Sequence, residues 1–215
     1  MKMKFYDALQ MDPAILKRKI AACDTKQDKL YYWTAMAVRS VLIVAFAIVF
    51  ISLLSGVFGS DNTPMAVALF CIMLGIRFVN FEYCIGDSLL TLAATLAILV
   101  LAPSAAAVLP PVFLIPLHFV SFFLILSMTT QRPEMGNGGL YNFAYIYLTG
   151  NPVAGEALIR RGLLAVVGYL LCAAILVAKH RHQHKTVRFH HVVRKFDLAN
   201  PVYMWQLRMA LGVSL

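Results

Sequence analysis

Long, unbroken apolar runs constrain this chain more than any other feature. Val41–Phe58, Leu89–Leu101 and Phe119–Met128 are almost entirely apolar, and most such runs extend into longer apolar stretches. A helix needs about 20 mainly apolar residues to cross the hydrocarbon core of a bilayer. Strands of a membrane barrel would alternate polar and apolar residues instead. The pattern therefore predicts an all-α polytopic transmembrane bundle.

The placement of basic residues predicts how many times the chain crosses. Five strong apolar runs cover residues 34–58, 65–82, 86–102, 106–128 and 157–178. Of the 19 Lys and Arg residues, eight lie in residues 1–39 and seven lie beyond residue 178. Such clusters stay on the cytoplasmic side, which requires an even number of crossings. We therefore expect residues 140–150 to enter the membrane as a broken fifth span, giving about six spans.

These spans predict four regions along the chain. Residues 1–33 form a cytoplasmic helical leader, and residues 34–178 form the six-span bundle. The sixth span is expected to continue as a basic cytoplasmic helix over residues 179–202. Residues 203–215 resemble residues 31–45, because interfacial aromatic residues and one arginine precede an apolar run in both. We interpret them as the start of a second transmembrane repeat, of the kind common in transporters.

The net charge of +9 predicts contact with the lipid bilayer and no binding of nucleic acid, because the basic residues flank the spans. His180 and His184 share a helix face, but Lys and Arg residues interleave with them and would repel a metal ion. We therefore predict no metal and no cofactor. The chain also has no nucleophile elbow or phosphate-binding loop, so we do not expect an enzyme.

Residues 131–162 are the strongest candidate for a substrate site. Glycine and proline interrupt both ends of this segment, a pattern typical of membrane binding sites. Tyr141 and Tyr145 share a helix face, with Asn142 beside Tyr145, and could stack and hydrogen-bond an aromatic substrate. The alternative is that these aromatic residues anchor a helix at the headgroups. Arg160 and Arg161 follow; they could bind a carboxylate or reach the outer headgroups.

Two further polar residues lie within apolar runs. Arg77 either faces inward as part of a substrate pathway or pairs at the cytoplasmic rim. His118 either relays protons or is a satisfied histidine inside the bundle. We include Arg77 among the candidate substrate-binding residues, with Arg160, Arg161, Tyr141, Asn142 and Tyr145.

Four segments carry a family resemblance: MKFYDALQMDPAILKRKI, PMAVALFCIMLGIRFVNFEYCIGDSL, PEMGNGGLYNFAYIYLTGNPVAGE and KHRHQHKTVRFHHV. Together they resemble the N-terminal half of bacterial FUSC-type inner-membrane proteins, the fusaric-acid-resistance and aromatic-acid-exporter family. The resemblance implies a six-span bundle, a cytoplasmic segment and a second bundle. It also implies export of small organic anions, often aromatic.

The sequence is compatible with three functions. The first is an exporter of small, aromatic carboxylate anions in the bacterial cytoplasmic membrane, working as a homo-oligomer, expected to be a dimer. The second is a passive anion channel in which the same arginines set selectivity through their field. The third is a membrane scaffold that acts through its basic cytoplasmic helix.

Overall fold

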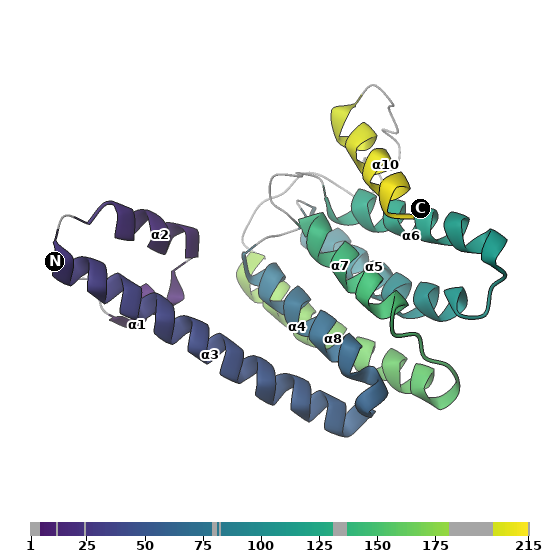
Figure 1. Ribbon diagram of the computed structural model, residues 1–215, viewed down its shortest axis with the longest axis horizontal. Coiled ribbons are helices and arrows are strands. Elements are labelled where there is room, and N and C mark those ends of the chain that lie inside the picture. Colours follow the sequence, from purple (N-terminus) through teal and green to yellow (C-terminus); the bar gives the residue numbers. More distant parts are fainter. Residues whose placement is uncertain are drawn as a thin grey trace. The chain divides into compact units, whose positions relative to one another are not determined.

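The computed structural model describes residues 5–11, 13–23, 25–78, 81, 83–130, 137–180 and 200–214. Every regular element within them is helical, which confirms the predicted all-α class (Figure 1). The elements are α1 (Phe5–Gln10), α2 (Pro13–Ala21), α3 (Lys26–Phe58), the short 3-10 helix η1 (Ser60–Asn62), α4 (Thr63–Phe78), α5 (Ile85–Ala106), α6 (Pro111–Thr129), α7 (Asn137–Thr149), α8 (Gly155–His180) and α10 (Pro201–Ser214).

Four of these helices, α3, α5, α6 and α8, are long and apolar enough to cross a bilayer. Helices α4 and α7 are shorter, with 16 and 13 residues. At about 1.5 Å of rise per residue they reach roughly 24 Å and 20 Å, against a hydrocarbon core of about 30 Å. The chain is therefore a polytopic helical bundle, and its count of six spans stays a prediction.

The chain forms two compact units, and the first comprises Met1–Ser52. Helix α3 begins with a capping arrangement, because Thr25 Oγ1 accepts a hydrogen bond from the Asp28 amide and donates one to the Asp28 carboxylate. Lys19 lies over the ring of Tyr32, with its Nζ 5.8 Å from the centroid. Helix α3 runs without a break through residue 33, so the predicted leader and first span share one helix.

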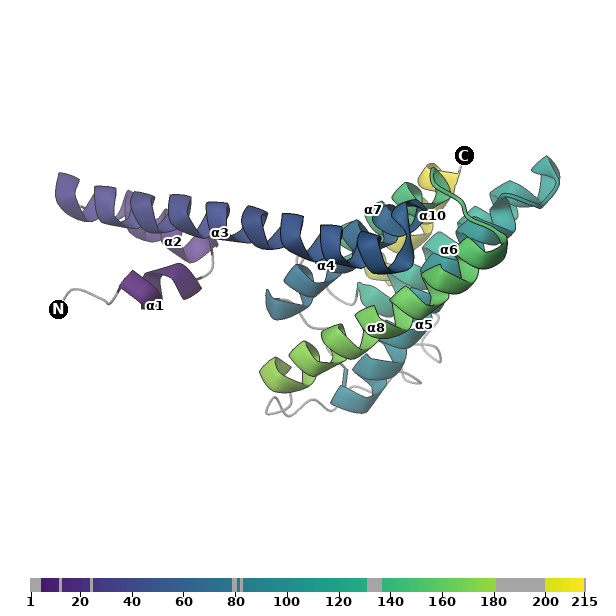
Figure 2. The same cartoon turned by 90° about the horizontal axis from the view of Figure 1, so that it is seen from below.

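The second unit, Leu53–Leu215, contains the helices from α4 onward. Helix α8 packs between α4 and α5, and α7 packs against α4, α5 and α6 (Figures 1 and 2). The α4–α8 contact is close because Gly168 has no side chain: a Cβ there would lie 2.3 Å from Leu69 Cδ2. Helix α7 is thus held inside the bundle by three neighbours, which is why a helix of this length can be stable.

The C-terminal helix α10 packs against α6. Its Gln206 Nε2 donates hydrogen bonds to the carbonyl oxygens of Leu126 and Thr130, at the C-terminal end of α6. Helix α8 continues to His180, and residues 181–199 of the predicted cytoplasmic helix lie outside the described residues. A helix does begin where the second repeat was expected, and the repeat itself stays a prediction.

Candidate binding cavity and a buried arginine

One face of α7 supplies the core of the candidate site. Tyr141, Ala144, Tyr145 and Leu148 are all at most 1% exposed, and they recur at the spacing of one helix face. Asn142 is also buried, with 8% of its surface exposed. The predicted face of Tyr141, Asn142 and Tyr145 therefore lies inside the bundle.

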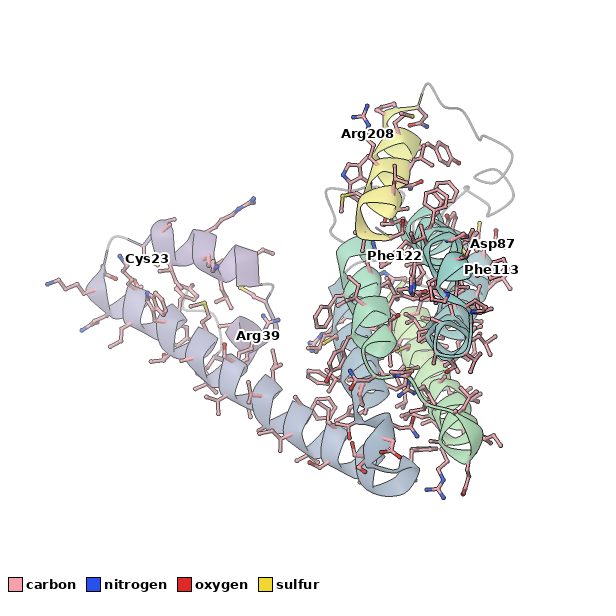
Figure 3. All side chains as sticks on the ribbon, turned by 45° about the vertical axis from the view of Figure 1, so that its right-hand side comes forward. Cys23, Arg39, Asp87, Phe113, Phe122 and Arg208 are labelled. Atoms are coloured by element: carbon pink, nitrogen blue, oxygen red, sulfur yellow. The ribbon has the colours of Figure 1, made fainter. Side chains whose placement is uncertain are left out.

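A cavity of about 340 Å³ lies beside Tyr145, between α6, α7 and α10. Its wall combines aromatic rings, two hydroxyl groups, an imidazole and aliphatic side chains: His118, Phe122, Tyr145, Ile146, Thr149, Gly150 and Val213. Phe122, labelled in Figure 3, comes from α6, and Val213 comes from the last turn of α10. Three segments distant in sequence therefore form one cavity.

His118 and Tyr145 form the polar centre of this cavity. The Nδ1 atom of His118 and the hydroxyl oxygen of Tyr145 lie 3.0 Å apart, within hydrogen-bond distance. The ring of Phe122 packs edge-on against Tyr145, with centroids 4.8 Å apart. Thr149 Oγ1 donates a hydrogen bond to the Tyr145 carbonyl, 2.9 Å away. The cavity thus offers aromatic faces for a ring and neutral polar groups for its substituents.

Arg161 lies nearby but is wholly buried, with 0% of its surface exposed. Its Nε donates to Asn62 Oδ1 (3.1 Å), its Nη1 to the Asn151 carbonyl (2.9 Å) and its Nη2 to the Asp61 carbonyl (3.1 Å). Asn62 in turn donates to the carbonyls of Phe58 and Ala157. The guanidinium therefore joins η1, the α7–α8 loop and α8 at one end of the bundle.

The other predicted site residues are spread over the molecule. Arg160 is half exposed and forms an ion pair with Glu156 one turn earlier. Arg77 is exposed in the last turn of α4. It lies fourteen residues after Thr63, where α4 follows η1, and so at the opposite end of that helix from η1. Tyr141 packs against the ring of Phe81, with centroids 5.8 Å apart. The six predicted residues therefore do not converge on one point, and only Tyr145 lines the cavity.

Two residues of this region were missing from the predicted set. His118 was recognised only as a histidine in an apolar span, and its partner Tyr145 lies 27 residues away. Asn62, which is 1% exposed, lies in the short link after the first span and carried no signal beyond being polar. Both gain their importance from contacts between distant segments, which spacing along the chain does not show.

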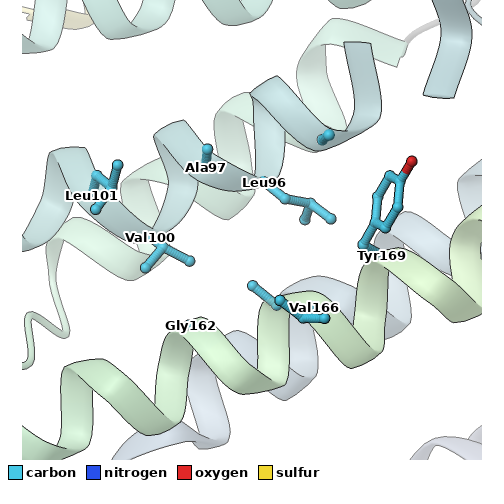
Figure 4. Close-up of a pocket in the computed structure, with 9 residues that line it drawn as sticks. Leu96, Ala97, Val100, Leu101, Gly162, Val166 and Tyr169 are labelled. Atoms are coloured by element: carbon cyan, nitrogen blue, oxygen red, sulfur yellow. The ribbon is translucent and has the colours of Figure 1, made fainter. Parts of the chain in front are cut away.

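A second cavity, of about 310 Å³, lies between α5 and α8 (Figure 4). Alanine, leucine, valine and glycine line it, and the one polar group on its wall is the hydroxyl of Tyr169. Such a wall cannot offset the desolvation of an anion. The cavity beside Tyr145 is therefore the better candidate for a polar ligand.

No metal site is apparent in the part of the chain that the structure describes, where no three His, Cys, Asp or Glu side chains cluster. His180 Nε2 lies 3.0 Å from the Ile76 carbonyl oxygen. The remaining histidines of the basic segment, from His182 onward, lie outside the described residues.

Comparisons with protein-family models, with curated proteins and with solved structures find no match to this chain.

Proposed function

We propose that this protein transports small aromatic carboxylate anions across the bacterial cytoplasmic membrane, as an exporter. The observation that supports this function best is the cavity that His118, Tyr145, Phe122 and Thr149 line within a bundle of apolar helices. Polar groups inside such a bundle are costly and commonly mark substrate pathways.

The cavity matches an aromatic acid in size and in chemistry. Its volume of about 340 Å³ lies within the usual range for small-molecule sites. Phe122 and Tyr145 contribute aromatic rings to the wall, where they pack edge-on against each other and are 3% and 1% exposed. The Tyr145 hydroxyl and the His118 imidazole share one hydrogen bond, so the neutral pair keeps one O–H or N–H group that can donate to a carboxylate oxygen. An aromatic acid therefore has a ring for the apolar part of the wall and a carboxylate for its polar part.

The arginines act near the cavity in this proposal. Gly150 lines the cavity, and the next residue, Asn151, accepts a hydrogen bond from Arg161. Positive charge at this end of α8 raises the local concentration of anions. Arg160 is the exposed member of the pair, while Arg161 has at least three donors committed to protein oxygens. We therefore assign Arg160 to attracting the anion and Arg161 to holding the framework.

The experiment is uptake of radiolabelled benzoate by proteoliposomes that contain the full chain. We expect Tyr145→Phe to reduce benzoate flux, because it removes the hydroxyl that meets His118 and keeps the ring. The matched control is Tyr147→Phe, the same change on the same helix, since Tyr147 stacks on Phe143 and does not line the cavity. Cyclohexanecarboxylate, which has the charge without the aromatic ring, should compete poorly with benzoate.

Equal flux in the two tyrosine variants and the wild type, with equal insertion into the liposomes, would contradict the cavity assignment. The concentration dependence also separates two mechanisms. Flux that saturates indicates a carrier, and a linear current that follows voltage indicates the passive channel.

The charge distribution supports placing the N-terminus and the basic segment after α8 in the cytoplasm. Membership of the FUSC family and a homodimeric state belong to the same proposal.

A further inference from the structure

The register of α6 and α7 can be followed from their contacts. A Cβ on Gly138 would lie 2.1 Å from Thr130 Oγ1 and 2.8 Å from Leu126 Cδ2, so the start of α7 touches the end of α6. Further along, Tyr145 of α7 meets Phe122 and His118, which lie earlier in α6. The two helices are therefore antiparallel. Asn142 lies one turn after Gly138 on the same side, between these two levels.

Helix α10 follows the same register along α6. Gln206 binds the carbonyls of Leu126 and Thr130, and Val213, two turns later, shares the cavity wall with His118. Gln206 and Asn142 thus both lie beside the last turn of α6. The cavity lies one to two turns further along the three helices.

The two amides each present a buried oxygen. Gln206 is 1% exposed and Asn142 is 8% exposed. Within the described residues, Gln206 Oε1 and Asn142 Oδ1 accept no hydrogen bond. The orientation of Gln206 is fixed, because its Nε2 faces two carbonyl oxygens and a reversed amide would place oxygen against oxygen. Such buried acceptors call for a hydrogen-bond donor or a positive charge.

The surroundings favour a positive charge. The C-terminal end of a helix carries partial negative charge and carbonyl groups without helical partners. The hydroxyls of Thr129 and Thr130 add further oxygens at the same end, 3.5 Å apart. Hard cations prefer oxygen ligands, and membrane transporters bind monovalent cations at helix C-termini. None of these oxygens belongs to a carboxylate, which favours a single charge over a divalent ion.

We propose that Asn142 Oδ1 and Gln206 Oε1, at the C-terminal end of α6, form a binding site for an alkali-metal cation, sodium or potassium. The site lies one to two turns from the cavity and on the same three helices. A cation bound there joins α7 and α10 across the end of α6, and this links its occupancy to the helices that line the cavity.

The experiment measures thermal unfolding of the full chain in detergent during titration with NaCl, KCl or choline chloride at constant ionic strength. A thiol-reactive dye reports unfolding through Cys172, which is 1% exposed in α8, once the partly exposed Cys23, Cys71 and Cys84 have been replaced by serine in every protein compared. We expect sodium or potassium to raise the unfolding temperature saturably, and choline to have no such effect. Asn142→Leu should lose the saturable response. Gln27→Leu, which removes an exposed amide of α3, should keep it.

An equal response to choline, or an unchanged saturable response in Asn142→Leu, would overturn the assignment. If Asn142→Leu fails to fold, binding of ²²Na⁺ and of ⁸⁶Rb⁺, a tracer for potassium, to the wild-type protein decides. Saturable binding of either tracer that the unlabelled chloride salt displaces and that Gln206→Met weakens supports the site, and absence of binding for both tracers refutes it. No organic anion is present in these measurements, so their outcome is independent of the transport assay.

Discussion

Replacement of Arg161 by glutamine tests whether this arginine holds the framework or binds substrate. The side chain is fully buried and donates to three oxygens, those of Asn62, Asn151 and Asp61. A glutamine is shorter and neutral, so it cannot meet all three. Hydrogen bonds in membrane proteins contribute about 0.6 kcal/mol each on average, and those of charged donors elsewhere reach about 1.5 kcal/mol or more.

The expected loss of stability is therefore about 2–4 kcal/mol, before allowance for burial of the charge. Removing a buried charge also removes its desolvation cost, so the net loss of stability should lie near the lower value of about 2 kcal/mol. At about 2–4 °C per kcal/mol for a chain of this size, the unfolding temperature should fall by about 4–8 °C. Arg161→Lys should recover only part of this, because an ammonium group lacks the planar fork of donors.

The assay is thermal unfolding in detergent, followed through the reaction of buried Cys172 with a thiol-reactive dye in a chain whose three partly exposed cysteines are replaced by serine. Arg160→Gln is the matched control, since Arg160 is the adjacent residue and is half exposed. Exposed ion pairs contribute about 0–1 kcal/mol, so its unfolding temperature should stay close to that of the wild type. If Arg161→Gln unfolds at the same temperature as the wild type, the structural role of Arg161 is refuted. If that equally stable variant also loses benzoate flux, the result favours direct binding of the anion by Arg161.

Two further changes test the packing and the first unit. Gly168→Ala should destabilise the fold by about 1–3 kcal/mol, because its Cβ would meet the buried Leu69 side chain. Gly162→Ala, on the same helix, is the control. No atom lies within 4 Å of its Cβ, so this change should be neutral or slightly stabilising. The reverse order of unfolding temperatures would contradict the close α4–α8 contact. Thr25→Ala should destabilise the start of α3 by about 0.5–2 kcal/mol, which would appear as faster hydrogen exchange over the first turn. Thr25→Ser keeps the hydroxyl group and should keep the amides protected. Equal exchange rates in the two variants would argue against the cap.

The positions of the helices were largely readable from the sequence. A span must satisfy its backbone hydrogen bonds internally and be apolar over its length, and both requirements act on consecutive residues. The same local logic placed a helix at 140–150 and put Tyr141 and Tyr145 on one face, and the structure shows that this face is buried. The lengths of α4 and α7 were harder to predict, because their neighbours in the bundle allow short helices to be stable.

The site depended on contacts that no local pattern contains. His118 meets Tyr145 across 27 residues, and Arg161 meets Asn62 across 99. The paired arginines look equivalent in sequence, yet adjacent positions on a helix point about 100° apart, so one is buried and the other is half exposed. The sequence by itself therefore determined the membrane class and the faces of the helices. Only the tertiary structure decided which distant groups meet on those faces, because packing between helices selects each partner.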